Sequence, residues 1–141
     1  MGQFLEFVGN HPLLFTVLIV LVLMILMNES RRKLLGFKEV KHADAVSLIN
    51  SEDALMLDVR EEKEFSEGHV VNARNIPMGV LEGRVADIEE YKTKPVIVYC
   101  RTGQRSAKAA AILKRQGFTS IYKLSGGLLA WQDANLPVNR S

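Results

Sequence analysis

An uncharged apolar run near the N-terminus constrains this fold more than any other feature. It extends from Leu13 to Met27 and is hydrophobic on every face of a helix. Its fifteen residues would span only about 22 Å of helix, which is short of a hydrocarbon core of about 30 Å. Extending the helix back through Phe7 and forward to Asn28 closes this gap. The run therefore predicts one transmembrane helix within an anchor of residues 1–30.

Two alternatives to a membrane anchor are a cleaved signal peptide and a buried or self-associating helix of a soluble protein. A signal peptide needs positive charge before its apolar stretch and a small-residue cleavage site after it. Residues 1–12 contain Glu6 but no lysine or arginine, and the basic residues Arg31, Arg32 and Lys33 follow the run. The positive-inside rule therefore predicts an N-terminus outside the cell and a C-terminal part in the cytoplasm.

The remaining chain has the pattern of one globular domain. Residues 31–40 are expected to be a basic juxtamembrane linker, and residues 41–138 are long enough to bury a core. Strands are predicted at residues 54–59, 73–76, 96–99 and 120–124, and helices at 43–49, 61–67, 80–91, 106–116 and 128–134. This alternation predicts an α/β fold with a central parallel sheet flanked by helices.

The only cysteine opens a loop between a predicted strand and a predicted helix. The loop reads Cys100-Arg101-Thr102-Gly103-Gln104-Arg105-Ser106. Such a turn directs backbone N–H groups and the positive end of the helix dipole at one spot, and two arginines add charge. A thiol in this setting has a lowered pKa and is nucleophilic. The alternative, a buried strand-end cysteine beside solvated arginines, does not account for a glycine-containing, doubly basic loop.

Composition excludes several other kinds of site. One cysteine cannot form an internal disulfide, and no soft ligands lie beside it at zinc-site spacing. The net charge of +2 is too small to indicate a nucleic-acid partner. We therefore expect a free thiol in a reducing compartment, with an intermolecular disulfide as the alternative, and no cofactor, metal or nucleic-acid partner.

Several short motifs together resemble the rhodanese-like single-domain sulfurtransferases. They are Leu57-Asp58-Val59-Arg60-Glu61, Glu64-Phe65, Gly68-His69-Val70, Ala73-Arg74-Asn75-Ile76-Pro77, Val98 to Ser106, Gly126-Gly127 and Trp131. They span nearly the whole chain outside the anchor, in the family's order. A rhodanese-like domain behind one N-terminal anchor is similar to a known bacterial inner-membrane arrangement. The expected location is therefore the cell inner membrane, single-pass, with the domain in the cytoplasm.

The resemblance implies a role for each residue of the loop. Cys100 is the nucleophile that accepts a sulfane sulfur and carries it as a persulfide. The substrate-binding residues are Arg101, Thr102, Gly103, Gln104 and Arg105, whose amides cradle the terminal sulfur. The Arg105 guanidinium is expected to hold an anionic donor or the persulfide, and exposed Arg101 to steer donors. Gly103 supplies the backbone torsions of a tight loop, and Ser106 supports the loop.

Residues outside the loop are expected to be structural. Asp58 and Arg60 lie at a strand end, where a buried pair that braces the cysteine loop is favoured over proton transfer. His69 is expected to fix a loop, and Trp131 to pack in the core or at its rim. Asn72 stands where relatives usually have glycine, but asparagine tolerates positive φ, so the turn is expected to survive.

Loop length distinguishes this resemblance from its nearest rival. Dual-specificity phosphatases share the fold and carry the pattern Cys-x5-Arg, whereas four residues separate Cys100 from Arg105 here. The cradle is one residue smaller and is expected to fit sulfur better than phosphate. Phosphatase activity is therefore disfavoured.

The resulting hypothesis is a membrane-anchored, thiosulfate sulfurtransferase-like enzyme. It would move sulfane sulfur from thiosulfate or a persulfide to a thiol or cyanide, with Cys100 as the carrier. Its expected partners are small sulfur-containing anions or protein persulfides, the lipid bilayer and other membrane proteins. One alternative is an interaction module or scaffold for membrane-protein complexes, in which catalysis is secondary or vestigial. Another is a redox sensor that uses the same thiol.

Overall fold

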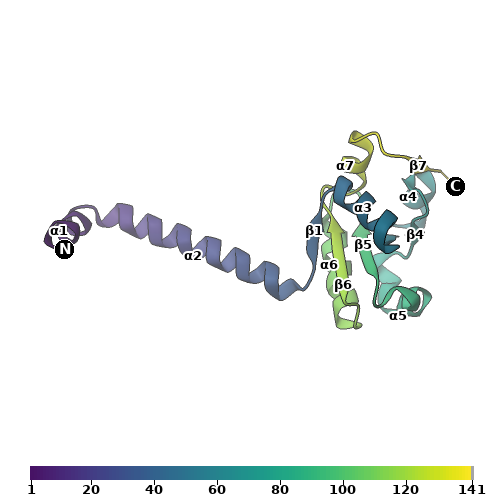
Figure 1. Ribbon diagram of the computed structural model, residues 1–141, viewed down its shortest axis with the longest axis horizontal. Helices are drawn as coiled ribbons and strands as arrows, with labels where there is room; N and C mark the ends of the chain where they lie inside the picture. Colours follow the sequence, from purple (N-terminus) through teal and green to yellow (C-terminus); the bar gives the residue numbers. More distant parts are fainter. Residues whose placement is uncertain (141) are drawn as a thin grey trace. The chain divides into compact units, whose positions relative to one another are not determined.

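The computed structural model describes residues 1–140, without the side chains of residues 32–35. The chain divides into two compact units, Met1–Leu35 and Gly36–Ser141. The first unit consists of the helices α1 (Gly2–Asn10) and α2 (Pro12–Leu35), which are separated by a bend at His11 (Figure 1). Pro12 suits the start of α2 because the first helical residue needs no backbone N–H.

Helix α2 is the candidate membrane span. Residues 12–31 are long and apolar enough to cross a membrane, and their side chains are not buried within the structure. All 24 residues of α2 extend about 36 Å at ~1.5 Å each, which exceeds a hydrocarbon core of about 30 Å. The expected extension back through Phe7 is wrong, because the chain bends at His11. The extra length comes instead from continuation of the helix beyond Asn28.

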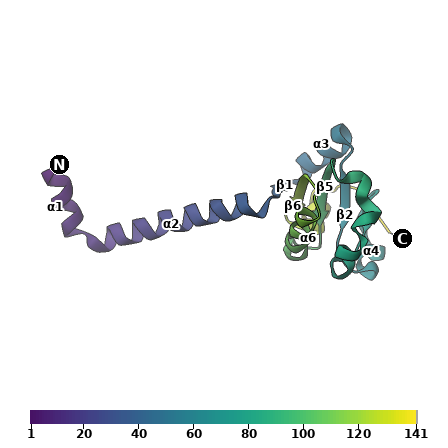
Figure 2. The ribbon, with the colours of Figure 1, turned by 90° about the horizontal axis from the view of Figure 1, so that it is seen from below.

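The second unit is built on a five-stranded sheet in which all neighbouring strands are parallel. The strand order is β1-β6-β5-β2-β4, which can be followed from β1 to β2 in Figure 2. The strands are β1 (Lys38–Val40), β2 (Leu55–Asp58), β4 (Arg74–Asn75), β5 (Pro95–Tyr99) and β6 (Ser120–Leu124). Two further short strands, β3 (His69–Val70) and β7 (Val138–Asn139), form an antiparallel pair.

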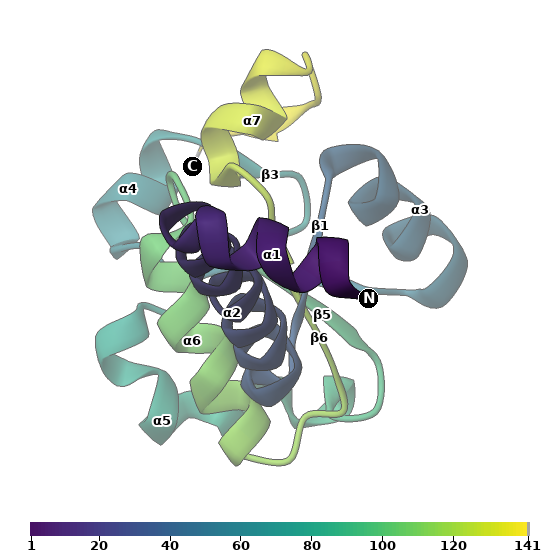
Figure 3. The same ribbon diagram turned by 90° about the vertical axis from the view of Figure 1, so that its left-hand side faces the viewer.

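Helices cover both faces of this sheet. The helices of this unit are α3 (His42–Glu52), α4 (Glu62–Glu67), η1 (Met78–Val80), α5 (Leu81–Arg84), η2 (Val85–Tyr91), α6 (Gln104–Arg115) and α7 (Gly127–Asp133). Side chains of α5, η2 and α6 pack on one face, whereas those of α3 and α7 pack on the other. Figure 3 shows α3 on one side of β5 and β6, with α5 and α6 on the other. The predicted parallel sheet flanked by helices is confirmed.

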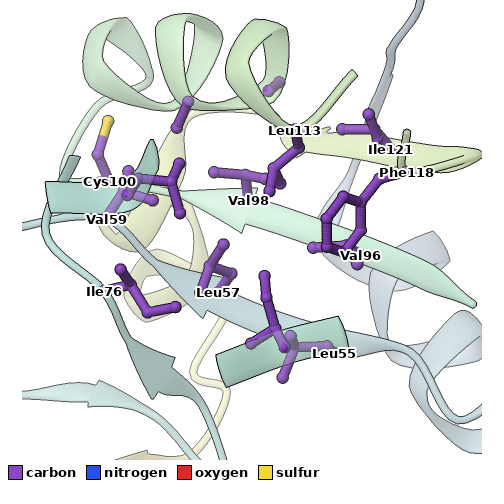
Figure 4. Close-up of a cluster of buried hydrophobic side chains, with 14 residues drawn as sticks. Leu55, Leu57, Val59, Ile76, Val96, Val98, Cys100, Leu113, Phe118 and Ile121 are labelled. Atoms are coloured by element: carbon purple, nitrogen blue, oxygen red, sulfur yellow. The ribbon is translucent and has the colours of Figure 1, made fainter. Parts of the chain in front are cut away.

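The central strand β5 alternates between two hydrophobic cores. Val96 and Val98 face the α6 side, while Ile97 and Tyr99 face the α3 side. Every residue of β5 is buried, as in strands of parallel sheets that are covered on both faces. Cys100 continues the alternation and joins the α6 cluster, where it lies beside Val59 at one end (Figure 4). The strand period thus directs the cysteine toward the first turn of α6.

Some elements differ from those expected from the sequence. Residues 38–40, expected within the linker, form β1 and pair with β6. Helix 80–91 is broken into η1, α5 and η2, and Ile88 has non-helical φ and ψ of −123° and 20°. Its apolar face is nevertheless confirmed, since Leu81 and Ile88 are fully buried. Gly83 and several β-branched residues are weak helix formers, so packing rather than helix propensity holds this segment.

Candidate active site

Cys100 lies at the carboxyl end of β5, immediately before α6, and is only 1% exposed. The backbone N–H of Gly103 donates a hydrogen bond to the Cys100 Sγ at 3.0 Å. The Ser106 Oγ lies 3.7 Å from Sγ and donates to the Gly103 carbonyl oxygen at 2.9 Å. The sulfur therefore sits in the predicted cradle at the start of the helix.

The hydrogen bonds of this cradle lower the pKa of Cys100. Burial by itself raises the pKa of Cys100, but hydrogen bonding with the amide and side chain of Ser106 and with the amides of Gly103 and Thr102 outweighs the effect of burial. The expected direction of the shift is thus found, although its main causes are hydrogen bonds rather than arginine charges. A lowered pKa increases the fraction of nucleophilic thiolate near neutral pH.

Replacement of Ser106 by alanine is expected to raise the pKa of Cys100, because the variant lacks the hydroxyl that can turn from the Gly103 carbonyl to the thiolate, while the backbone amide remains. Alkylation of Cys100 by iodoacetamide at pH 7 should slow by about two- to tenfold, and its pH profile should move to higher pH. The measurement is the alkylation rate as a function of pH. An unchanged profile in the folded variant would show that the hydroxyl does not stabilise the thiolate.

Two glycines shape the loop. Gly103 has a φ of +127°, which confirms the predicted need for glycine torsions. Gly127 has a φ of +60°, and a Cβ at this position would lie 2.5 Å from the Arg101 carbonyl oxygen. The amides of Leu128 and Leu129 donate to the carbonyls of Cys100 and Arg101 at 2.9 and 3.3 Å. Gly127 thus allows α7 to approach the backbone of the cysteine loop closely, and the first amides of α7 hold the carbonyls of that loop.

Arg105 is held by a carboxylate that had no role assigned from the sequence. Its two terminal nitrogens donate to the Glu64 carboxylate at 2.7 and 3.0 Å. The hydrogen bond from Arg105 lowers the pKa of Glu64 to about 2. Glu64 also accepts from the Glu61 amide in the capping box of α4. An anionic donor that bound Arg105 would therefore compete with Glu64, and the predicted role of Arg105 in holding a donor stays a prediction.

Replacement of Glu64 by glutamine is expected to destabilise the domain only where Glu64 is ionised. The pKa is depressed in the folded chain, so the stabilisation is fully present above about pH 4.5 and is lost as the pH falls toward 2. Both side chains are about one-third exposed, so we expect a loss of about 1 kcal/mol at pH 7. The measurement is urea unfolding of both variants between pH 2 and 7.

The charge of Glu64 is isolated by this comparison, because glutamine retains an oxygen that accepts the capping hydrogen bond from Glu61. The wild type and the variant should therefore converge near pH 2. A difference in free energy of unfolding that stays constant from pH 7 to pH 2 would contradict the ion-pair explanation.

Asp58 and Arg60 form the predicted buried ion pair. Asp58 is 0% and Arg60 5% exposed, and the closest charged atoms are 2.7 Å apart. Arg60 also donates to the Gly68 carbonyl at 2.7 Å, at the end of α4. The pair thus positions α4, the helix whose Glu64 holds Arg105 in the cysteine loop. We infer that its support of the loop acts through α4.

The other singled-out residues are placed as expected. The Nδ1–H of His69 donates a hydrogen bond to the Phe65 carbonyl oxygen, and the ring stacks on that of Phe65, so His69 fixes the loop. Trp131 is buried and donates a hydrogen bond to the Pro137 carbonyl. Asn72 has a φ of +62°, so it adopts the positive φ that was expected at this turn.

Three residues of the cysteine loop are exposed, namely Arg101, Thr102 and Gln104. Among residues 1–140, no three His, Cys, Asp or Glu side chains could jointly hold a metal ion.

Comparison with known proteins decides the family. Residues 41–134 match the family described as the rhodanese-like domain. The chain belongs to the rhodanese-like family. This rhodanese-like chain is 32% identical to the uncharacterized protein YibN of Escherichia coli K12 over 99% of both chains. The thiosulfate sulfurtransferase GlpE of Coxiella burnetii is 35% identical over 101 residues, which cover 68% of this chain and 88% of GlpE.

Solved rhodanese-like structures show the same fold. A crystal structure of a rhodanese-related protein from Thermoplasma volcanium has a TM-score of 0.66 and 31% identity. The match covers 74% of this chain and 99% of that chain, so it comprises one complete rhodanese-like domain. The YibN match, in contrast, also includes the N-terminal helices. The resemblance stated from the motifs and the expected fold are both confirmed.

Proposed function

We propose that the chain is a membrane-anchored sulfurtransferase that carries a sulfane sulfur on Cys100. The observation that supports this most directly is the buried Sγ, which accepts a hydrogen bond from the Gly103 amide and has a lowered pKa. A thiolate surrounded by donors is suited to attack a sulfur atom and then to hold a second, anionic sulfur. The donor is thiosulfate or a persulfide, and the acceptor is a thiol or cyanide.

The proposed reaction has two steps. The Cys100 thiolate attacks the outer sulfur of thiosulfate, the S–S bond breaks, and sulfite leaves with the electron pair. The resulting persulfide carries its negative charge on the terminal sulfur, which the loop amides stabilise. A thiolate or cyanide then attacks this terminal sulfur and receives it, which regenerates the Cys100 thiolate. No net oxidation occurs, and no cofactor is required by these steps.

We further propose that α2 crosses the inner membrane with the N-terminus outside and the domain in the cytoplasm. The apolar side chains of residues 13–27 are exposed, apart from the half-buried Phe15, and a surface of this kind requires cover by lipid or protein. Basic residues concentrated after the apolar part support the orientation. Protease digestion of inside-out membrane vesicles would test it, since the domain should be cleaved only in that orientation.

The test of sulfur transfer is the intact mass of the full chain in detergent after incubation with thiosulfate. We expect a gain of about 32 Da, one sulfur, which dithiothreitol removes because it is held in an S–S bond. Peptide mapping should locate the gain at Cys100. A folded chain that gains no sulfur from thiosulfate or from a thiol persulfide would contradict the proposal.

A scaffold role is the second candidate, and the anchor is the observation that favours it. An enzyme for diffusible thiosulfate gains nothing evident from a tether, whereas a module that delivers sulfur to a membrane complex does. A strain that lacks this protein can be complemented with the full chain or with residues 31–141. Full rescue by the untethered domain would contradict the scaffold role.

A further inference from the structure

The charges around the cysteine loop are not equally available to an anionic substrate. Arg105 is held by two hydrogen bonds to Glu64, which also serves the cap of α4. Arg101 is exposed, and the described part of the chain provides no ion pair for it. A third cation, Lys123, reaches the loop from a distant part of the sequence. These arrangements leave Arg101 and Lys123 as the candidates for contact with a donor.

Lys123 lies in β6, opposite Val98 of β5 and Glu39 of β1. A Cβ built on Gly103 would lie 3.1 Å from its Cε and 3.3 Å from its Nζ. Because the Gly103 amide binds Sγ at 3.0 Å, standard bond lengths place Nζ within about 9 Å of Sγ. This separation is shorter than a Debye length of about 10 Å at 0.1 M salt, so the ammonium field reaches the sulfur.

The Lys123 ammonium lies at the N-terminal end of a helix, which is an unfavourable position for a cation. It lies beside Gly103, the residue that precedes α6, where the helix dipole is already positive. A cation is unfavourable there unless an anion compensates it. Glu39 provides one hydrogen bond at 3.1 Å, and its side chain is 52% exposed while that of Lys123 is 18% exposed. An anionic ligand can therefore displace Glu39 from its single hydrogen bond with Lys123 more easily than it can displace Glu64 from its two hydrogen bonds with Arg105.

We infer that Lys123 determines substrate specificity by binding the oxyanion end of the sulfur donor, and that Glu39 is the internal carboxylate which the donor displaces. The inference rests on the proposed sulfur transfer and adds the residue that selects anionic donors. Lys123 does not contact the reacting sulfur atoms, so its effect is on donor binding. Its removal should therefore change KM for thiosulfate and leave kcat nearly constant.

The variants Lys123→Met and Glu39→Gln act in opposite directions. Methionine retains the apolar stem of Lys123 but removes the charge, so KM for thiosulfate should rise about tenfold. Glu39→Gln removes the competing carboxylate, so KM should fall. Lys94→Met is the matched control, because Lys94 precedes β5 at the opposite end from Cys100 and pairs with Asp53. The control should have the KM of the wild type.

A second readout does not depend on sulfur transfer. Iodoacetate and iodoacetamide alkylate the same Cys100 thiolate but differ in charge. The rate of alkylation by anionic iodoacetate divided by the rate for neutral iodoacetamide, measured on the full chain in detergent, should fall in Lys123→Met and rise in Glu39→Gln. Iodoacetamide controls for any change in thiolate fraction. Both changes should shrink at 1 M salt, where the Debye length is about 3 Å.

The outcomes separate the two proposals. An active wild type with an unchanged KM in Lys123→Met would overturn the inference alone. An unchanged rate ratio in both variants would also overturn it. A wild type that accepts no sulfur would instead contradict the proposed function, while the rate ratio would still show whether Lys123 selects anionic reagents at Cys100.

Discussion

Replacement of Cys100 by serine is expected to abolish sulfur loading and turnover while the fold remains intact. A serine hydroxyl is not ionised near neutral pH, so it provides no thiolate to attack a sulfane sulfur. Serine has nearly the same shape, and its oxygen can accept the hydrogen bond that the Gly103 amide donates to Sγ. The measurements are the intact mass after thiosulfate treatment and the thermal unfolding midpoint.

The matched control for this variant is Ser106→Ala, which alters the cradle but retains the thiol. It should still gain one sulfur, only more slowly. The chain contains no second cysteine. A dithiothreitol-sensitive gain of one sulfur in Cys100→Ser would therefore contradict the assignment of Cys100 as the carrier.

Replacement of Asp58 by alanine is expected to cause the largest loss of stability, about 3–5 kcal/mol. The backbone amide and the side chain of Arg60 donate to the Asp58 carboxylate at distances between 2.7 and 3.1 Å. Alanine would leave the buried Arg60 guanidinium with one hydrogen bond, to the Gly68 carbonyl, and with no anion among the described residues to pair with it. Domains are stable by about 5–15 kcal/mol, so much of the margin would be lost.

Urea unfolding followed by tryptophan fluorescence measures this loss, since Trp131 is the only tryptophan and is 3% exposed. The control is the double variant Asp58→Leu with Arg60→Met. It removes both charges and retains apolar volume, so it should recover much of the lost stability. A cost of less than about 1 kcal/mol for Asp58→Ala would contradict the view that this pair is desolvated and essential.

Local sequence patterns were sufficient to predict the centre of the site. The apolar run before Cys100, the glycine in the loop and the alanine-rich helix after it all act between neighbouring residues. Their outcome is a strand, a positive φ at Gly103 and a helix whose first amides face the sulfur. The same reasoning predicted the parallel sheet, because the alternation of strands and helices is also a local property.

The limits of prediction are clearest in the short elements. Strand β1 has three residues, and β3 and β7 have two each. Segments of this length show no recognisable period of their own. They become strands only because β6 presents hydrogen-bonding groups to β1, and because β3 and β7 lie side by side. Likewise, the bend at His11 separates α1 from α2 although both segments favour helix.

By itself, the sequence determined the apolar helix, the order of the longer strands and helices along the chain and the position of Cys100 between a strand and a helix. Only the tertiary structure decided which charges surround Cys100. Glu64 lies 41 residues from Arg105, and Glu39 lies 84 residues from Lys123. Such pairs depend on the order of strands in the sheet, which no local pattern encodes. The physical reason is that ion pairs act over a few ångströms in space, at any separation along the chain.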